Sequence, residues 1–138
     1  MEISKYKKYH KIKKIGKNEK DSLQNLKKGF YGLKVLEPGV ITPKQLETAR
    51  RVIARITKRT GKIFINVSCT QPLTKKPLLS RMGKGAGAIN AWIGYVKKGK
   101  VIIEVKGISK KLAFIALKAV QYRLCIKTDI TEREIIDA

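Results

Sequence analysis

Apolar residues recur at helical spacing between residues 43 and 60. Thr42-Pro43-Lys44-Gln45 precedes them and supplies a hydroxyl at the N-cap, proline at the first helical position and an amide three residues after the cap. This arrangement is typical of a capping box. We therefore predict a helix that begins after Thr42 and is stopped by Gly61. Its core face is predicted to consist of Leu46, Ala49, Val52, Ile53 and Ile56.

Strand-like patterns lie on both sides of this helix. Residues 30–36 alternate weakly and end at a Glu-Pro-Gly turn signal, whereas residues 62–67 alternate with Ile63, Ile65 and Val67 on one face. Further strands are predicted at residues 90–96 and 100–106. Because Lys97-Lys98-Gly99 separates these two runs, we expect them to form a β-hairpin.

A second helix is predicted after Ser109, which offers an N-cap, and a last strand near residues 124–130. The apolar face of this helix is predicted to be Leu112, Ile115, Ala116, Ala119 and Val120. The order of elements indicates an α+β fold of two helices packed on a mixed, mostly antiparallel sheet, with a long basic loop and a basic N-terminal arm. We expect residues 1–28 to be a basic N-terminal extension and residues 29–138 to be a single α+β domain.

The charge of the chain indicates that this fold serves to bind a partner. The 138 residues include 32 Lys and Arg against 10 Asp and Glu, a formal net charge of +22. Such a charge repels itself in a compact monomer, so a polyanion that screens it is the simplest partner. Nucleic acid is the first expectation and an anionic membrane the second. No stretch approaches the roughly 20 apolar residues of a transmembrane helix.

Catalytic and metal-binding chemistry has little support in the sequence. Cys69 and Cys125 lie far apart and His10 has no nearby carboxylate, so we expect no metal site, no cofactor and no enzyme activity. An RNA-modifying enzyme would need a catalytic group such as Glu104 or Cys69. A general architectural nucleic-acid protein is the other alternative.

The segment of residues 75–87, K-K-P-L-L-S-R-M-G-K-G-A-G, combines cations with three glycines. Glycine permits positive φ and close approach of backbone N–H groups to an anion, while Arg81 and Lys84 add charge. The spacing fits neither the G-x-x-x-x-G-K-[ST] motif nor the G-x-G-x-x-G motif of nucleotide-binding proteins. We predict an RNA-contacting loop; a plain flexible surface loop is the alternative.

Four of the seven arginines fall within ten residues. Arginine pairs with two phosphate oxygens through a planar fork, so we interpret this cluster as specific RNA contacts. Arg51, Arg55 and Arg59 are predicted to form one stripe on the helix. The alternative is a solvated basic face, on which Glu47 pairs with at most one of Arg50 and Arg51.

The first 28 residues contain ten lysines and two tyrosines, Tyr6 and Tyr9. We expect this arm to follow a phosphate surface, with a tyrosine available to stack on a base. A solvating tail is the alternative. Arginine is missing from the arm and acids are present, which is not typical of a cleaved targeting peptide. Trp92 and Phe64, on presumed strands, favour core packing over base stacking.

Several segments resemble, in order, the motifs of one ribosomal protein family. They are Tyr31-Gly32-Leu33-Lys34, Ile41-Thr42-x-x-Gln45-Leu46-Glu47-x-Ala49-Arg50-Arg51, Lys58-Arg59-x-Gly61-Lys62-Ile63, Lys76-Pro77-Leu78, Arg81-Met82-Gly83-Lys84-Gly85-x-Gly87 and Ile126-Lys127-Thr128. The family is the bacterial-type large-subunit ribosomal protein sixteen, related to the L-ten-e proteins. The chain is similar to it from about Lys5 to Thr128, and the Arg81 to Gly87 segment is a strong signal.

This resemblance implies a structural protein of the large ribosomal subunit that helps to position tRNA and catalyses no reaction. The implied partners are large-subunit ribosomal RNA, tRNA at the aminoacyl site and neighbouring large-subunit proteins; we expect no membrane contact and no stable homo-oligomer. The residues implied to bind ribosomal RNA are Lys5, Lys8, Lys11, Lys14, Arg50, Arg51, Arg55, Lys58, Arg59 and Lys62. The residues implied to form a loop near tRNA and the peptidyl-transferase region are Lys75, Lys76, Arg81, Met82, Gly83, Lys84, Gly85 and Gly87.

Departures from the family pattern bear on where the protein works. Ser68-Cys69-Thr70-Gln71-Pro72 replaces the usual F-P-D-K-P, and residues 88–92 lack the usual acid. This drift, together with heavy use of Lys and Ile, suggests an A+T-rich, fast-changing genome. With no presequence expected, we predict an organelle-encoded protein of the mitochondrial ribosome, in the mitochondrial matrix. The alternative is the bacterial cytoplasm.

Overall fold

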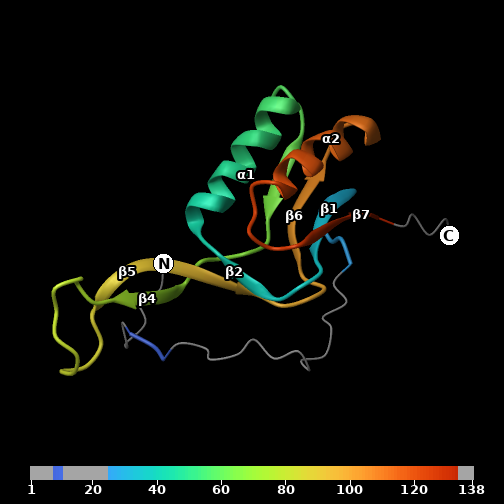
Figure 1. Cartoon of the computed structure of the whole chain (residues 1–138). Coiled ribbons are helices and arrows are strands. Elements are labelled where there is room, and N and C mark those ends of the chain that lie inside the picture. The colour runs from blue at the N-terminus through green and yellow to red at the C-terminus, as the bar shows by residue number, and fades with distance from the viewer. Residues whose placement is uncertain (1–7, 11–24, 134–138) are drawn as a thin grey trace.

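The computed structural model describes residues 8–10 and 25–133. Within them the chain forms two helices and two antiparallel sheets (Figure 1). The elements in order are β1 (Tyr31–Val35), β2 (Gly39–Ile41), α1 (Pro43–Ile56), β3 (Lys62–Ile65), β4 (Gln71–Lys75), β5 (Ala88–Val96), β6 (Val101–Lys106), α2 (Lys110–Gln121) and β7 (Thr128–Glu132). The α+β class is therefore confirmed. The prediction of one mixed sheet is wrong, because the described residues form two sheets and every strand pairing in them is antiparallel.

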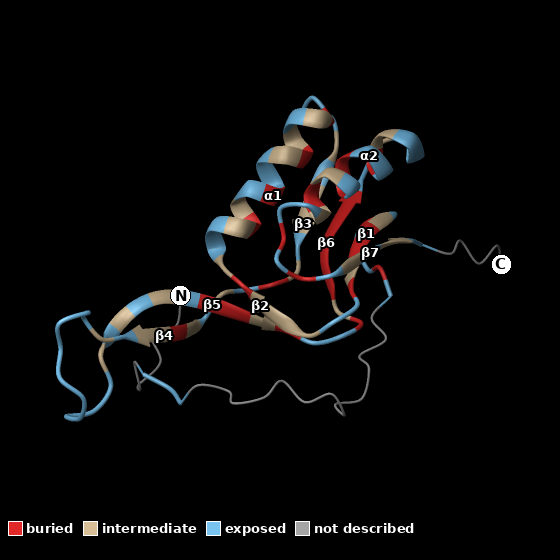
Figure 2. Cartoon of the chain, viewed as in Figure 1, coloured by how far each residue is buried: buried red, intermediate tan, exposed pale blue. Residues whose placement is uncertain are grey.

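The larger sheet, in the order β3-β6-β1-β7, carries both helices on one face (Figure 1). Burial is greatest along β6, which is buried from Val101 to Val105 and lies between β3 and β1 (Figure 2). Leu33 of β1, Ile53 of α1 and Leu117 of α2 pack in the same apolar cluster. The smaller sheet, in the order β2-β5-β4, extends away from this core (Figure 1).

Helix α1 begins as the sequence predicts but ends earlier. Thr42 accepts a hydrogen bond from the backbone N–H of Gln45, and the Gln45 side chain accepts one from the backbone N–H of Thr42, which completes the capping box. Leu46, Ala49 and Ile53 are buried. The helix ends at Ile56, because Lys58 and Arg59 adopt φ values of 49° and 63°, which are left-handed.

Gly61 therefore has a different role from the predicted one. A Cβ at this position would lie 2.8 Å from Cγ2 of Ile108 and 3.2 Å from the carbonyl oxygen of Lys106. Glycine lets the chain entering β3 pass close to the end of β6. The basic stripe predicted for the helix accordingly breaks: Arg51 and Arg55 lie on α1, whereas Arg59 lies beyond its end.

The hairpin predicted around Lys97-Lys98-Gly99 is wrong. Strand β5 pairs with β2 and β4, while β6 pairs with β1 and β3, so the turn carries the chain from one sheet to the other. The backbone N–H of Gly99 donates to the carbonyl of Val35 at 2.8 Å, and the N–H of Val35 donates to that of Lys100 at 2.9 Å. The turn is thus bonded to the end of β1.

The hairpin that does form joins β4 to β5. Strand β4 was not predicted, because Pro72 interrupts it and its residues do not alternate. The pairing runs from Gln71 opposite Ile93 to Lys75 opposite Ala88, with an irregularity between Leu73 and Thr74. Residues 76–87 connect the two strands at the far end of the hairpin (Figure 1).

Helix α2 follows Ser109, but its buried face differs from the predicted one. Ser109 occupies the N-cap position without a side-chain hydrogen bond to the helix. The buried residues are Ala113, Ala116, Leu117 and Val120, whereas Ile115 is 60% exposed. The observed buried face is therefore rotated about the helix axis relative to the predicted one. The last strand starts at Thr128, after a segment in which Leu124 and Ile126 are buried.

Candidate nucleic-acid interface

Residues 76–87 form an exposed loop at the tip of the β4–β5 hairpin (Figure 2). The loop narrows at Gly87, where an added Cβ would lie 2.4 Å from the carbonyl oxygen of Lys75 and 2.8 Å from the backbone nitrogen of Lys76. These neighbours are backbone atoms of the facing strand end. Only glycine therefore allows the two segments of the backbone to approach so closely at the base of the loop.

The tip of the loop has a left-handed backbone at three consecutive residues. Gly83, Lys84 and Gly85 have φ values of 96°, 57° and 80°. Glycine adopts such values freely, whereas Lys84 does so at a cost. The Lys76 ammonium donates a hydrogen bond to the Gly83 carbonyl, which links the first residue of the loop to this turn.

Large apolar side chains at the tip lie in solvent. Leu78, Leu79 and Met82 are 97%, 100% and 101% exposed. Met82 therefore packs against no other part of the described residues. Exposed apolar groups next to Arg81 and Lys84 suit a partner that has both apolar surfaces and negative charges. RNA is such a partner, because its bases offer apolar faces and its phosphates are charged. The loop encloses an open hollow of about 500 Å³, lined by residues that include Lys76, Arg81 and Lys84.

The arginines of α1 differ in their partners. Glu47 pairs with both Arg50 and Arg51, although the sequence suggested at most one of them: Arg50 Nη2 lies 2.8 Å and Arg51 Nε 3.0 Å from Glu47 Oε1. The hydrogen bonds from Arg50 and Arg51 lower the pKa of Glu47 to about 2. Arg55 and Arg59 are exposed and have no ion pair within the described residues.

The predicted site residues fall into groups that the structure keeps apart. Arg55, Lys58, Arg59 and Lys62 lie at and beyond the C-terminal end of α1, away from the β4–β5 hairpin (Figure 1). All four are exposed. Of the arm lysines, Lys8 is described and exposed, while Lys5, Lys11 and Lys14 lie outside the described residues. The boundary between arm and domain stays a prediction, although Leu26 is already buried.

The burial of two side chains differs from what their residue types suggest. Trp92, expected in the core, is 46% exposed on β5, opposite Pro72 of β4. Glu104, in contrast, is buried in β6 and accepts hydrogen bonds from the backbone N–H groups of Lys28 and Gly29 and from the Asn66 amide. Its position as the single acid in the apolar run Val101–Val105 was the available signal.

The groups named for a possible enzyme lack catalytic surroundings. Burial raises the pKa of the Cys69 thiol, against a smaller opposite effect of the backbone N–H of Gly94, so the thiol stays protonated. No group of three potential metal ligands occurs in residues 8–10 and 25–133. Neither helix of this described part is long and apolar enough to cross a membrane.

Comparison with known proteins gives one consistent result. The family model for ribosomal protein L16p/L10e matches residues 1–131. Large ribosomal subunit protein uL16 of Buchnera aphidicola (subsp. Baizongia pistaciae) is 42% identical over 126 residues, which cover 91% of this chain and 90% of the relative. The uL16 protein of Staphylococcus carnosus is 38% identical over 130 residues, covering 94% and 89% of the two chains. The uL16c protein of Oltmannsiellopsis viridis is 37% identical over 130 residues, covering 94% and 96%.

Proposed function

We propose a function for this chain from its family: it belongs to the ribosomal protein L16p/L10e family. In this proposal α1 binds large-subunit ribosomal RNA, and the loop of residues 76–87 extends toward tRNA at the aminoacyl site. Membership itself makes the chain a structural, non-enzymatic protein of the large ribosomal subunit, with ribosomal RNA and ribosomal proteins as partners. What we propose is the set of contacts that the chain makes with ribosomal RNA and tRNA.

The exposed end of α1 supports the RNA contact. Arg55 and Arg59 carry charges that no acid in the described residues neutralises, and Lys58 and Lys62 extend the same surface. A rigid, capped helix holds such side chains at fixed spacing, which favours bidentate pairing of each guanidinium with phosphate. Arg50 and Arg51 are held by Glu47 and reach phosphates only by sharing or leaving that pair.

The tip of the hairpin supports the tRNA contact. The single observation that carries the proposal is the full exposure of Leu78, Leu79 and Met82 on a turn fixed by Gly83, Gly85 and Gly87. A soluble protein gains nothing by exposing three such side chains unless a partner covers them. Arg81, Met82 and Lys84 are the residues that we assign to this contact.

The RNA contact is tested by comparing two exposed cations. Arg55→Ala is expected to weaken binding to large-subunit ribosomal RNA about five- to tenfold, whereas Lys118→Ala on the exposed face of α2 leaves it nearly unchanged. Filter binding at fixed salt measures both. Equal losses would mean that α1 contributes only general charge. Failure of the unchanged chain to sediment with the large subunit at moderate salt would contradict the proposal as a whole.

The tRNA contact is tested in assembled subunits. Arg81→Ala is expected to reduce tRNA occupancy of the aminoacyl site while leaving incorporation of the protein intact. Arg123→Ala, an exposed arginine after α2, is the matched control. If both variants bind tRNA like the unchanged protein, the loop does not serve this site.

The protein works in the ribosome, and its compartment is a proposal. The relatives named above come from bacteria and, for uL16c, a chloroplast. We propose a mitochondrial ribosome, in the mitochondrial matrix, on the lysine-rich composition and the drift at residues 68–72. The bacterial cytoplasm is the second candidate, which the two bacterial relatives favour. Fractionation of the source cells, with detection of this chain in organelle or bulk ribosomes, decides between them.

A further inference from the structure

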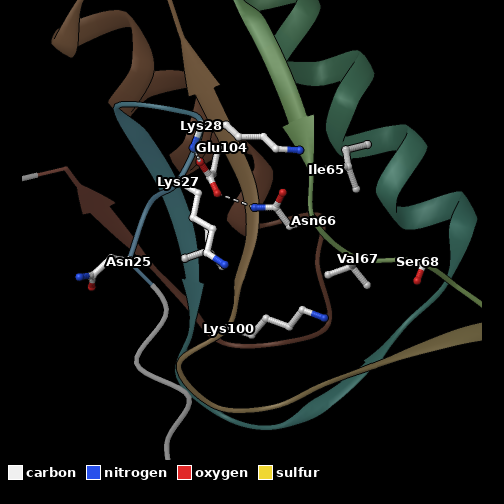
Figure 3. Close-up of a pocket in the computed structure, with 10 residues that line it drawn as sticks. Asn25, Lys27, Lys28, Ile65, Asn66, Val67, Ser68, Lys100 and Glu104 are labelled. Carbon is white, nitrogen blue, oxygen red and sulfur yellow. Dashed lines mark hydrogen bonds between the residues drawn. The ribbon is translucent and has the colours of Figure 1, made fainter.

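A second basic hollow lies on the larger sheet, apart from α1 and from the loop of residues 76–87. Its volume is about 500 Å³, and Asn25, Lys27, Lys28, Lys100 and Ser68 are among the residues that line it. Figure 3 shows Lys27 and Lys28 reaching it from the segment before β1 and Lys100 from the start of β6. We call this hollow the Lys27–Lys100 notch.

The one acid among the residues that line the notch has its carboxylate oxygens occupied by uncharged hydrogen-bond donors. Glu104 Oε1 accepts a hydrogen bond from the Asn66 amide at 2.6 Å (Figure 3). Its Oε2 accepts hydrogen bonds from the backbone N–H groups of Lys28 and Gly29, both at 2.7 Å. Its carboxylate forms no ion pair with a lysine within the described residues. The lysine charges therefore remain available to a ligand.

The three lysines differ in what they face. The Lys28 ammonium lies 5.8 Å from the centre of the Phe64 ring, which holds it at one side of the notch. Lys27 and Lys100 form no ion pair with any acid in the described part of the chain. Ile65, which is 38% exposed, and Val67 add an apolar wall beside these cations.

We propose that the Lys27–Lys100 notch holds a phosphodiester group of ribosomal RNA, with the sugar of that nucleotide against Ile65 and Val67. This inference rests on the proposed function and adds to it an RNA contact on a surface that the family motifs do not cover. Lys27 and Lys100 supply the donors to the phosphate oxygens, since Asn25 and Ser68 lie on opposite sides of the notch (Figure 3).

The charge around the notch favours RNA over an acidic protein segment. Lys27 and Lys28 reach the notch from the segment before β1, and Lys100 reaches it from the position before β6. An RNA strand carries one negative charge per nucleotide and brings a phosphate to these cations wherever it crosses the notch, whereas a protein segment must place a carboxylate at this one position.

The test measures the salt dependence of binding to large-subunit ribosomal RNA by the full chain. Each lost phosphate contact reduces the magnitude of the log-log slope by about 0.7 to 0.9, so the double variant Lys27→Ala, Lys100→Ala, which loses the one phosphate in the notch, is expected to reduce it by that amount. Lys118→Ala is the control and should leave the slope unchanged. Lys27→Arg with Lys100→Arg should retain it, which also shows that substitution at these positions is tolerated.

Three outcomes of the comparison between variants overturn the inference. They are an unchanged slope in the double variant, an equal change in Lys118→Ala, and a defect that appears only with ribosomal proteins present, which would assign the notch to a protein partner. Inorganic phosphate as a competitor separates a strand contact from a free-anion site: half-displacement of RNA at millimolar phosphate would overturn it as well. Because Arg55→Ala reports on α1 in the same assay, failure of the notch is distinguishable from failure of the proposed function.

Discussion

The carboxylate of Glu104 holds the backbone of Gly29, whose N–H donates to Oε2 at 2.7 Å across 75 positions of sequence. Glu104 is only 1% exposed, and its remaining hydrogen bonds go to the backbone of Lys28 and the amide of Asn66. The segment before β1 is thereby fixed to β6. This attachment fixes the course of the chain as it enters β1.

Replacing this carboxylate by an amide should destabilise the protein. In Glu104→Gln, one oxygen still accepts from the backbone N–H groups of Lys28 and Gly29, while the new NH₂ group faces Asn66, whose amide must turn over to accept from it. The charge-assisted hydrogen bonds of the carboxylate are replaced by weaker neutral ones. We expect the free energy of unfolding to fall by about 2 kcal/mol. Urea denaturation measures the change.

The matched control is Glu37→Gln, because Glu37 pairs with Lys127 in solvent. Exposed ion pairs contribute little, so this variant should unfold at the same urea concentration as the unchanged protein. A loss in Glu104→Gln no larger than that in Glu37→Gln would contradict a structural role for the buried carboxylate.

Glu104 should also make stability depend on pH. Burial alone would raise the pKa of its carboxyl, but the hydrogen bonds from Gly29, Lys28 and Asn66 outweigh burial and hold the pKa below the ordinary value. The unfolded chain then takes up this proton at higher pH than the folded chain does. The stabilisation is complete above the ordinary pKa of glutamate and is lost as pH falls through the folded pKa.

The difference in stability between the unchanged protein and Glu104→Gln should therefore shrink with acidification. Urea midpoints of both proteins at about pH 6 and about pH 3 test this. A difference that stays constant between the two pH values would show that the folded pKa is not lowered.

Gly87 should control the geometry of the loop through its lack of a side chain. Gly87→Ala places a Cβ 2.4 Å from the carbonyl oxygen of Lys75, so the base of the hairpin must open. We expect a loss of about 1–3 kcal/mol and faster hydrogen exchange in β4 and β5. Gly85→Asn is the control, because the site is open and asparagine tolerates its φ of 80°. Similar exchange rates in the two variants would contradict the close approach at Gly87.

Local signals explain which parts of the fold could be predicted. The start of α1 followed from Thr42, Pro43 and Gln45, because a capping box depends only on neighbours in sequence. The end of α1 did not, since Lys58 and Arg59 adopt left-handed conformations that their side chains do not favour. Which sheet a strand joins is a long-range property, and the turn at Gly99 gave no sign of it.

The candidate site divides in the same way. Arg55 and the glycines of the loop carry their chemistry in the residue type, so sequence was enough to name them. The Lys27–Lys100 notch joins segments far apart in the chain and could not be predicted without the pairing of β6 with β1 and β3. The two pairs made by Glu47 also depend on side-chain geometry that spacing leaves open.

Removing the charge of Glu47 should strengthen RNA binding. Arg50 and Arg51 both pair with this carboxylate, whose pKa of about 2 keeps it charged at physiological pH. Glu47→Gln releases the two guanidinium groups for phosphate, so affinity for ribosomal RNA should rise about three- to tenfold and the salt slope should steepen. Glu37→Gln makes the same change of net charge next to Lys127. Equal gains in both variants would assign the effect to net charge alone.

Arg59 should show a conflict between stability and binding. Its φ of 63° lies in the left-handed region, which costs an L-residue about 1–2 kcal/mol but suits glycine. Arg59→Gly should therefore raise the free energy of unfolding by about 0.5–1 kcal/mol after the entropy cost of glycine is subtracted. The same variant should bind ribosomal RNA more weakly, because a guanidinium at the end of α1 is lost. Lys58→Gly, at a φ of 49°, controls for the backbone effect. Thermal denaturation and filter binding on one preparation decide the matter: a variant that gains stability and retains full affinity would remove Arg59 from the RNA contact.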